Sequence, residues 1–232
     1  NEYFEIMVAC ISDAGGMLDK FIGDAIMAGF GVPLPSEDAA DAAVRSSIAM
    51  ISELRIWNAD RVKADKMPVG MGVGVNTDNV VTGNIGSSKR MDFTMIGDGV
   101  NLAARLEGSC KTYGAQIIIS EFTQNNLKGI YALRELDRIV VKGKTEPVSI
   151  FEVLDFHDDE TFPARMDVVG HFTEGLAHYR GTKFDDAIKS FRAALDANSE
   201  DVPSKLYIER CELFKKSPPP KDWSGEWVMT EK

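Results

Sequence analysis

The sequence is poor in cysteine, in basic residues and in long apolar runs, and each shortage excludes a class of protein. Its three cysteines, Cys10, Cys110 and Cys211, are far apart and odd in number, which favours reduced thiols in a cytoplasmic compartment over a disulfide framework. No apolar run approaches the roughly 20 residues of a membrane helix. Acidic residues number 36 against 26 lysines and arginines, giving a net charge of −10. Nucleic acid and anionic membranes are therefore not expected partners.

The remaining composition is that of a globular protein. The 232 residues are 44% hydrophobic, enough for one domain that combines helices and strands, plus a small appendage. The chain opens with Asn1-Glu2-Tyr3-Phe4, with neither an initiator methionine nor a basic leader. This beginning is typical of a fragment of a longer protein, so we expect further segments before it.

Alternating apolar patterns predict an α+β fold, in which helices and strands form a layered sandwich. We expect helices over 2–13, over a long stretch capped by Ser36 and ended by Pro68, after the glycine loop in "MDFTMIGDGVNLAARLEGSC" (91–110) and over 121–127. Expected strands are two within 17–31, then 69–77, 78–86, 91–96 and 115–120, and a final hairpin over 131–155.

The character of the chain changes after residue 155. We predict a main domain over 1–155, a polar linker over 156–167, a small all-α appendage over 168–216 and a Pro/Trp tail over 217–232. Within the appendage, Ala187, Phe191 and Ala194 show the small-large-small spacing of a tetratricopeptide-like hairpin, although Ser199 replaces the repeat's usual proline. A lone repeat cannot form a solenoid, so this part is expected to pack on the main domain or on a dimer mate. Trp223 and Trp227 are expected to anchor the tail.

Within the stretch "LDKFIGDAIMAGFG" (18–31), Lys20 and Asp24 are the only charges between Asp19 and Glu37. Because burying an unpaired charge is costly, each side chain must reach water or a ligand. A carboxylate at such a turn suits a hard cation such as Mg²⁺, which often shares its oxygen ligands with phosphates. The residues alone are equally compatible with an ordinary surface turn.

Two further stretches carry groups that suit phosphate and sugar. In "DFTMIGDGVNLAARLE", Asn101 and Arg105 stand four residues apart on one helical face, and Thr94 lies across the glycine loop. In "VVKGKTEPV", Lys142 and Lys144 flank a glycine and can lie over a polyphosphate. Taken singly, these stretches also fit a capped helix and a basic hairpin tip.

In this order, "DKFIGDAIMA", "RMDFTMIGDGVNLAARLE" and "VKGKTEPV" resemble the catalytic domain of class III nucleotidyl cyclases, over about residues 3–155. The resemblance implies a ferredoxin-like cyclase sandwich with a mixed or antiparallel sheet. It also implies a homodimer with two active sites between its subunits, each using two Mg²⁺ or Mn²⁺ ions. The implied reaction converts ATP to 3′,5′-cyclic AMP and pyrophosphate in a cytoplasmic signalling protein with an N-terminal sensor.

The resemblance also implies roles for individual residues. Asp24 matches a metal-binding aspartate, Lys20 the purine-selecting lysine and Thr94 its partner on the base. A lysine donates hydrogen bonds, which suits the N1 acceptor of adenine and not the N1–H donor of guanine, so ATP is favoured over GTP.

Three more residues match the part of the site that holds ribose and phosphates. Asn101 matches the residue that orients the ribose, Arg105 the one that stabilises the transition-state phosphate and Lys142 the one that holds the terminal phosphates.

The chain departs from the family pattern at two points. The family's first metal aspartate lies on a strand upstream of Asp24 that this chain does not contain, and Gly72 stands where some relatives carry a phosphate-binding arginine. Lys89 and Arg90 are candidate substitutes, although a hairpin tip explains them equally well. The alternatives are a guanylyl cyclase, a catalytically incomplete nucleotide-binding or dimerisation module, and a partner-binding role for the helical tail.

Overall fold

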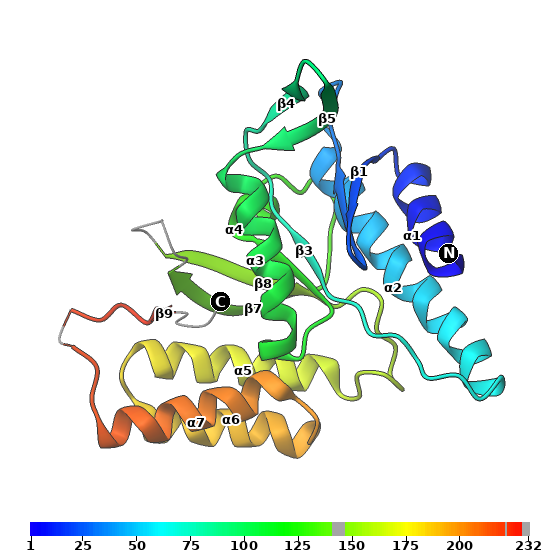
Figure 1. The fold of residues 1–232 in the computed structure, drawn as a ribbon. Helices are drawn as coiled ribbons and strands as arrows, with labels where there is room; N and C mark the ends of the chain where they lie inside the picture. The colour runs from blue at the N-terminus through cyan, green and yellow to red at the C-terminus, as the bar shows by residue number, and fades with distance from the viewer. Residues whose placement is uncertain (141–146, 221, 229–232) are drawn as a thin grey trace. The chain divides into compact units, whose positions relative to one another are not determined.

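The computed structural model describes residues 1–140, 147–220 and 222–228, with the exception of the side chain of Arg90. The chain divides into two compact units (Figure 1). The first unit comprises Asn1–Cys110 and Gln116–Tyr131, and the second comprises Lys111–Ala115 and Ala132–Lys232. Among the described residues, no helix combines the length and apolar character that a membrane span requires.

The first unit contains the elements up to α4. Its helices are α1 (Glu2–Asp13), α2 (Ala39–Lys63), α3 (Asp98–Tyr113, whose last residues belong to the second unit) and α4 (Glu121–Gln124). Its strands are β1 (Met17–Ile22), β2 (Ala25–Gly29), β3 (Val73–Val75), β4 (Val81–Ser87), β5 (Arg90–Ile96) and β6 (Ile117–Ser120). β1 pairs with β2 and β4 with β5, both antiparallel, whereas β3 pairs with β6 in parallel.

An apolar core joins α1 and α2 to the β1–β2 hairpin. The fully or nearly buried members are Met7, Ile11, Met50 and Leu54, and Ile26 on β2 packs against them. Figure 1 shows α1 and α2 side by side next to β1. The hairpin that carries Lys20 is thus fixed by burial of its apolar side.

A glycine determines how closely α3 approaches β3. A Cβ atom at Gly74 would lie 2.2 Å from the carbonyl oxygen of Ala103 and 2.3 Å from the amide nitrogen of Glu107. Only glycine permits this approach of strand and helix backbones. Gly74 therefore sets the position of the helix that carries Asn101 and Arg105.

The second unit contains β7 (Leu133–Val140), β8 (Val148–Val153), α5 (Arg165–Arg180), α6 (Phe184–Ala197), α7 (Val202–Lys216) and β9 (Trp227–Val228). β7 pairs antiparallel with β8 and parallel with β9. The three helices enclose a largely aromatic cluster that includes Phe172, Tyr179, Phe191 and Tyr207, and Trp223 packs against it. Trp223 is thus an anchor of the tail, as predicted.

The predicted α+β fold is confirmed, with three further helices near the C-terminus. Several local expectations are wrong. The long helix α2 ends at Lys63 and not at Pro68, and the short helix α4 ends at Gln124. Ser36 is not the cap of α2, because that helix begins at Ala39 with Asp38 at the cap position, and Ser36 Oγ instead accepts a hydrogen bond from the Asp38 amide at 3.3 Å. The strand expected over 69–77 is reduced to β3, Val73–Val75. The division into domains at residues 155, 167 and 216 stays a prediction, as does the likeness of the helices to a tetratricopeptide repeat.

Candidate active site

Lys20 and Thr94 meet directly, although 74 residues separate them in sequence. Lys20 lies on β1 and Thr94 on β5, and the ammonium Nζ donates a hydrogen bond of 2.7 Å to the threonine Oγ1. Thr94 is buried, whereas the side chain of Lys20 is 42% exposed. The lysine side of this pair is therefore the side that is open to solvent, and reading of a nucleotide base by the pair stays a prediction.

Asp19 joins the same pair and was missed by the sequence reasoning. Its carboxylate Oδ2 accepts a hydrogen bond of 3.0 Å from Thr94 Oγ1 and lies 3.4 Å from Lys20 Nζ. The side chain of Asp19 is fully buried. In the sequence, Asp19 is an acidic residue beside a lysine in a largely apolar run. That pattern also fits a solvated strand edge, so it does not reveal the contact with Thr94 on β5.

Asp24 lies at the turn between β1 and β2. Gly23 adopts a φ of +65° there, a conformation that favours glycine and directs the chain tightly from one strand into the next. Asp24 is exposed, and its charge adds to the effect of burial in raising the pKa of Tyr3. The predicted role of its carboxylate as a metal ligand stays a prediction.

Asn101 and Arg105 lie in the first half of α3 and both are exposed. The start of this helix is fixed by Asn76, whose amide Nδ2 donates a hydrogen bond of 3.1 Å to the carbonyl oxygen of Gly99. Asn76 Oδ1 in turn accepts a hydrogen bond of 2.6 Å from Ser120 Oγ. This bridge holds the ends of β3 and β6 against the start of α3.

The structure therefore unites one predicted pair, Lys20 with Thr94, and adds Asp19 to it. No contact described for this single chain joins Asp24 or Asn101 to that pair. Lys142 lies outside the described residues. The residues predicted to read the base and the residue predicted to orient the ribose thus lie on separate elements of this chain.

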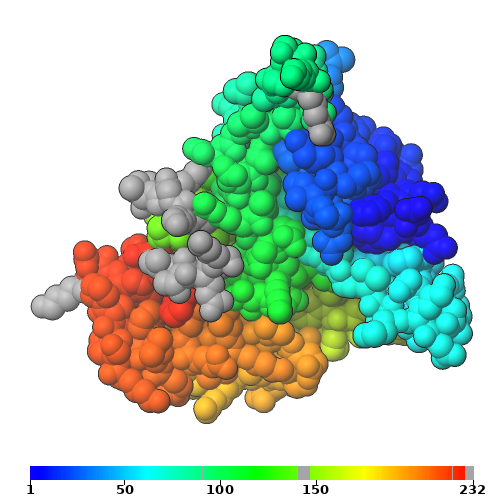
Figure 2. All heavy atoms as spheres, viewed as in Figure 1, coloured from blue at the N-terminus to red at the C-terminus, as the bar shows by residue number. Residues whose placement is uncertain are grey.

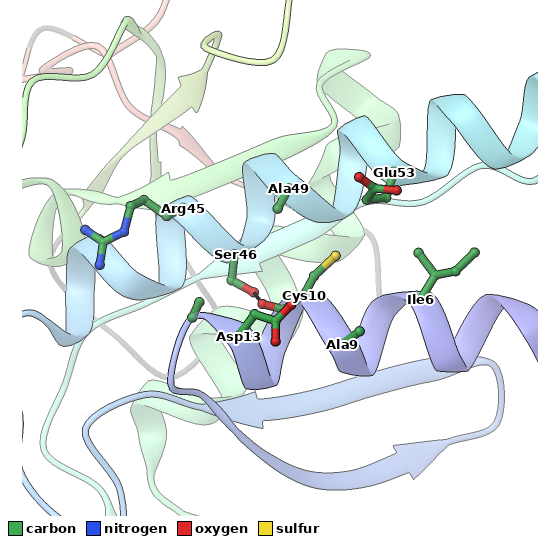
Figure 3. A pocket seen from close by; sticks show the side chains of 9 residues that line it. Ile6, Ala9, Cys10, Asp13, Arg45, Ser46, Ala49 and Glu53 are labelled. Carbon is green, nitrogen blue, oxygen red and sulfur yellow. Dashed lines mark hydrogen bonds between the residues drawn. The ribbon is translucent and has the colours of Figure 1, made fainter.

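A groove between α1 and α2 is unrelated to these residues. Figure 3 shows Cys10 and Asp13 on α1 facing Ser46 and Glu53 on α2. Ser46 Oγ donates a hydrogen bond of 3.1 Å to the carbonyl oxygen of Cys10, and burial, followed by the charges of Glu53 and Asp13, raises the pKa of the Cys10 thiol. A protonated thiol is a poor nucleophile, so the groove offers no evident chemistry.

The described residues hold no cluster of three or more His, Cys, Asp or Glu side chains that could bind a metal ion. A single carboxylate such as that of Asp24 fits a hard cation that takes its other ligands from phosphate oxygens and water, which is a common arrangement for Mg²⁺. The chain therefore supplies one candidate metal ligand, and no second carboxylate is described beside it.

The family model described as "Adenylate and Guanylate cyclase catalytic domain" matches residues 1–153. The chain belongs to this family. An adenylate cyclase of Dictyostelium discoideum, named as terminal-differentiation specific, is 34% identical over 217 residues, which are 91% of this chain and 10% of that protein. An adenylate cyclase of Anabaena cylindrica is 40% identical over 160 residues, which are 66% of this chain and 31% of that protein. The chain thus spans less than a third of the length of these curated relatives.

Solved structures of this cyclase family share the fold. The adenylyl cyclase CyaB of P. aeruginosa is 35% identical with a TM-score of 0.61, covering 68% of this chain and 82% of that one. The guanylyl cyclase Cya2 is 37% identical with a TM-score of 0.60, covering 65% of this chain and 76% of that one. Adenylyl and guanylyl cyclases resemble this cyclase domain equally well, so overall likeness does not decide the base that it reads.

Proposed function

We propose that the protein is an adenylyl cyclase that converts ATP to 3′,5′-cyclic AMP and pyrophosphate. The observation that carries the choice of ATP is the hydrogen bond between Lys20 and Thr94. It leaves the remaining ammonium protons of Lys20 free to donate to the N1 acceptor of adenine. Guanine presents an N1–H donor at that position, which a lysine cannot accept.

In the proposed reaction, the ribose 3′-oxygen attacks the α-phosphorus of ATP and loses its proton to solvent. The bond from the α-phosphorus to the bridging oxygen breaks, and pyrophosphate leaves with that electron pair. Asn101 orients the ribose, Arg105 stabilises the charge that develops on the α-phosphate, and Lys142 holds the terminal phosphates. A planar, permanently charged guanidinium suits the role assigned to Arg105.

We propose that Asp24 holds a divalent cation, Mg²⁺ or Mn²⁺, of which the family resemblance implies two per site. A bound cation neutralises phosphate charge and favours ionisation of the attacking hydroxyl. The family resemblance implies a second carboxylate ligand. The relatives named above are longer than the matched region, and we propose that this ligand and a regulatory domain lie in other parts of the natural protein.

The proposed active form is a homodimer. The β4–β5 hairpin, at the top of Figure 2, carries exposed apolar side chains, and exposed apolar patches mark interaction sites. Its exposed members are Val81, Ile85, Met91, Phe93 and Ile96. A second copy is the proposed occupant, because the base-reading and ribose-reading residues of one chain are not in contact and each site would take them from different subunits.

The activity is tested with the natural protein that contains this chain. Wild type and Lys20→Glu are incubated with ATP or GTP and with Mg²⁺ or Mn²⁺, and the cyclic nucleotides are quantified. Cyclic AMP from wild type, with at least a tenfold loss in Lys20→Glu, supports the proposal. Preferential formation of cyclic GMP would identify a guanylyl cyclase, and absence of both products would leave a binding or dimerisation module.

A further inference from the structure

Asp19, Lys20 and Thr94 form a triangle in which every hydrogen-bond direction is determined. A lysine ammonium only donates, a carboxylate only accepts, and a threonine hydroxyl has one proton and two lone pairs. Lys20 Nζ therefore donates to Thr94 Oγ1 at 2.7 Å, and Thr94 Oγ1 donates its single proton to Asp19 Oδ2 at 3.0 Å. One lone pair of the hydroxyl oxygen remains.

A β-bulge makes this triangle possible. The register between β1 and β2 shifts between Leu18 and Lys20, so Asp19 is the extra residue of the bulge. In a regular strand, neighbouring side chains point to opposite faces, and Asp19 and Lys20 could not both contact Thr94. The irregularity thus directs two adjacent charged side chains at one hydroxyl.

Burying the carboxylate of Asp19 costs free energy of folding, which a side chain with only a packing role would not need to do. Its side chain is fully buried, and its second oxygen, Oδ1, has no hydrogen-bond partner among the described residues. An unsatisfied buried carboxylate oxygen destabilises a fold, and such groups concentrate at functional sites.

We infer that Asp19 is a positioning residue for base selection, because it fixes the direction in which the Thr94 hydroxyl points. With its proton held by Asp19, Thr94 can offer a ligand only a lone pair. That lone pair accepts from the 6-amino group of adenine and repels the 6-oxo group of guanine or hypoxanthine. Lys20 reads N1, and Asp19, acting through Thr94, determines the reading of position 6. This inference rests on the proposed function, in that it concerns the same base-reading pair.

The experiment compares ATP with inosine triphosphate, which carries guanine's 6-oxo and N1–H groups without its 2-amino group. Equilibrium dissociation constants and cyclisation rates are measured for the natural protein and for Asp19→Leu, Asp19→Asn, Thr94→Val and Asp19→Leu combined with Thr94→Val. Asp92→Asn is the matched control, because Asp92 is an exposed carboxylate two residues before Thr94 on β5. Thermal melting of each variant reports whether it is folded.

We expect Asp19→Leu to reduce the preference for ATP about tenfold, roughly the contribution of one hydrogen bond, because the freed hydroxyl can donate to a 6-oxo group. Asp19→Asn keeps an acceptor and should retain most of the preference, as should Asp92→Asn. In the Thr94→Val background, Asp19→Leu should change the preference no further. If Asp19→Leu reduces the preference for ATP as much in the Thr94→Val background as in the natural protein, Asp19 does not act through Thr94 and the inference is overturned.

The two proposals fail in different ways. A protein that binds ATP in preference to inosine triphosphate through Asp19, yet forms no cyclic AMP, contradicts the cyclase activity and retains the inference. A cyclase whose base preference is unchanged in a folded Asp19→Leu variant contradicts the inference alone. A protein that binds neither nucleotide contradicts both. Asp19→Asn keeps the test decisive if Asp19→Leu does not fold, because loss of base preference in that acceptor-retaining variant would also overturn the inference.

Discussion

Arg210, on α7, donates a hydrogen bond of 2.5 Å from Nη1 to Oδ2 of Asp137, on β7. Both side chains are buried, and the hydroxyl of Tyr113 donates to the same carboxylate oxygen at 2.6 Å. Burial disfavours the charge of Arg210, but Asp137 together with Tyr207 and Tyr113 more than offsets that effect, so the pKa of Arg210 is raised. This ion pair links a helix beyond the cyclase family match to a strand within it.

Replacing Arg210 by Met should lower the free energy of unfolding by about 3–5 kcal/mol, because it leaves the carboxylate of Asp137 buried without its cation. Urea denaturation followed by circular dichroism measures the change. Arg192→Met, which removes an exposed arginine from α6, is the matched control and should change the free energy by less than about 0.5 kcal/mol. Equal effects of the two substitutions would show that the buried ion pair adds nothing to stability.

The sequence predicted the apolar framework more fully than its buried charges. The spacing of apolar residues located the helices and strands, because the residues of one buried face recur every two to four positions along the chain. Asp137 and Arg210 are 73 residues apart, and so are read separately as solvated charges until the fold brings them together. A second buried group, in which Arg134 contacts both Glu152 and Asp201, was missed for the same reason.

The candidate site could be predicted only where the types of its residues indicate their chemistry. Lys20 and Thr94 were assigned to the same base through a family resemblance; the structure shows a hydrogen bond between them, and their role in reading a base stays a prediction. Asp19 was not identified, since a β-bulge depends on the register between two strands and no local pattern reveals it.

Gly74→Ala should disturb the site without touching any of its residues. The added Cβ would lie 2.2 Å from the carbonyl oxygen of Ala103, so α3 must move away from β3. We expect a loss of about 1–3 kcal/mol in unfolding free energy and a fall in cyclase activity, because Asn101 and Arg105 move with the helix. Gly83→Ala on β4 is the control, since no atom lies within 4 Å of its added Cβ. Unchanged melting and activity in Gly74→Ala would contradict the close packing described here.

Asp41, near the start of α2, should make the first unit sensitive to acid. Burial alone would raise the pKa of its carboxyl, but hydrogen bonds from the backbone amides of Lys128 and Gly129 and from the Tyr131 hydroxyl bring that pKa below its ordinary value. A folded pKa below the unfolded value of about 3.9 means that the stabilisation is complete above the unfolded pKa. It is lost as pH falls through the folded pKa.

Asp41→Asn should therefore reduce the free energy of unfolding by about 1–3 kcal/mol at pH 7, and this deficit should narrow as the pH approaches 3. Urea titrations at several pH values measure it. Asp159→Asn, at an exposed turn, controls for the loss of one negative charge. A deficit that stays constant with pH would show that the charge of Asp41 is not what stabilises the loop at Lys128 and Gly129.

The thiol of Cys10 should react slowly with alkylating reagents, because burial and the charges of Glu53 and Asp13 raise its pKa. The thiolate is the reactive form, so alkylation by iodoacetamide should be slower at pH 7.5 than that of a cysteine in an unstructured peptide. The rate should continue to rise with pH beyond the range in which the peptide thiol levels off. Glu53→Gln should accelerate the reaction about two- to threefold by removing one nearby negative charge, as weak, partly screened electrostatics allow. Peptide mapping by mass spectrometry assigns the alkylated site. If Cys10 reacts as fast as the peptide thiol, then neither burial nor the acidic neighbours lower the reactivity of the Cys10 thiol in the α1–α2 groove.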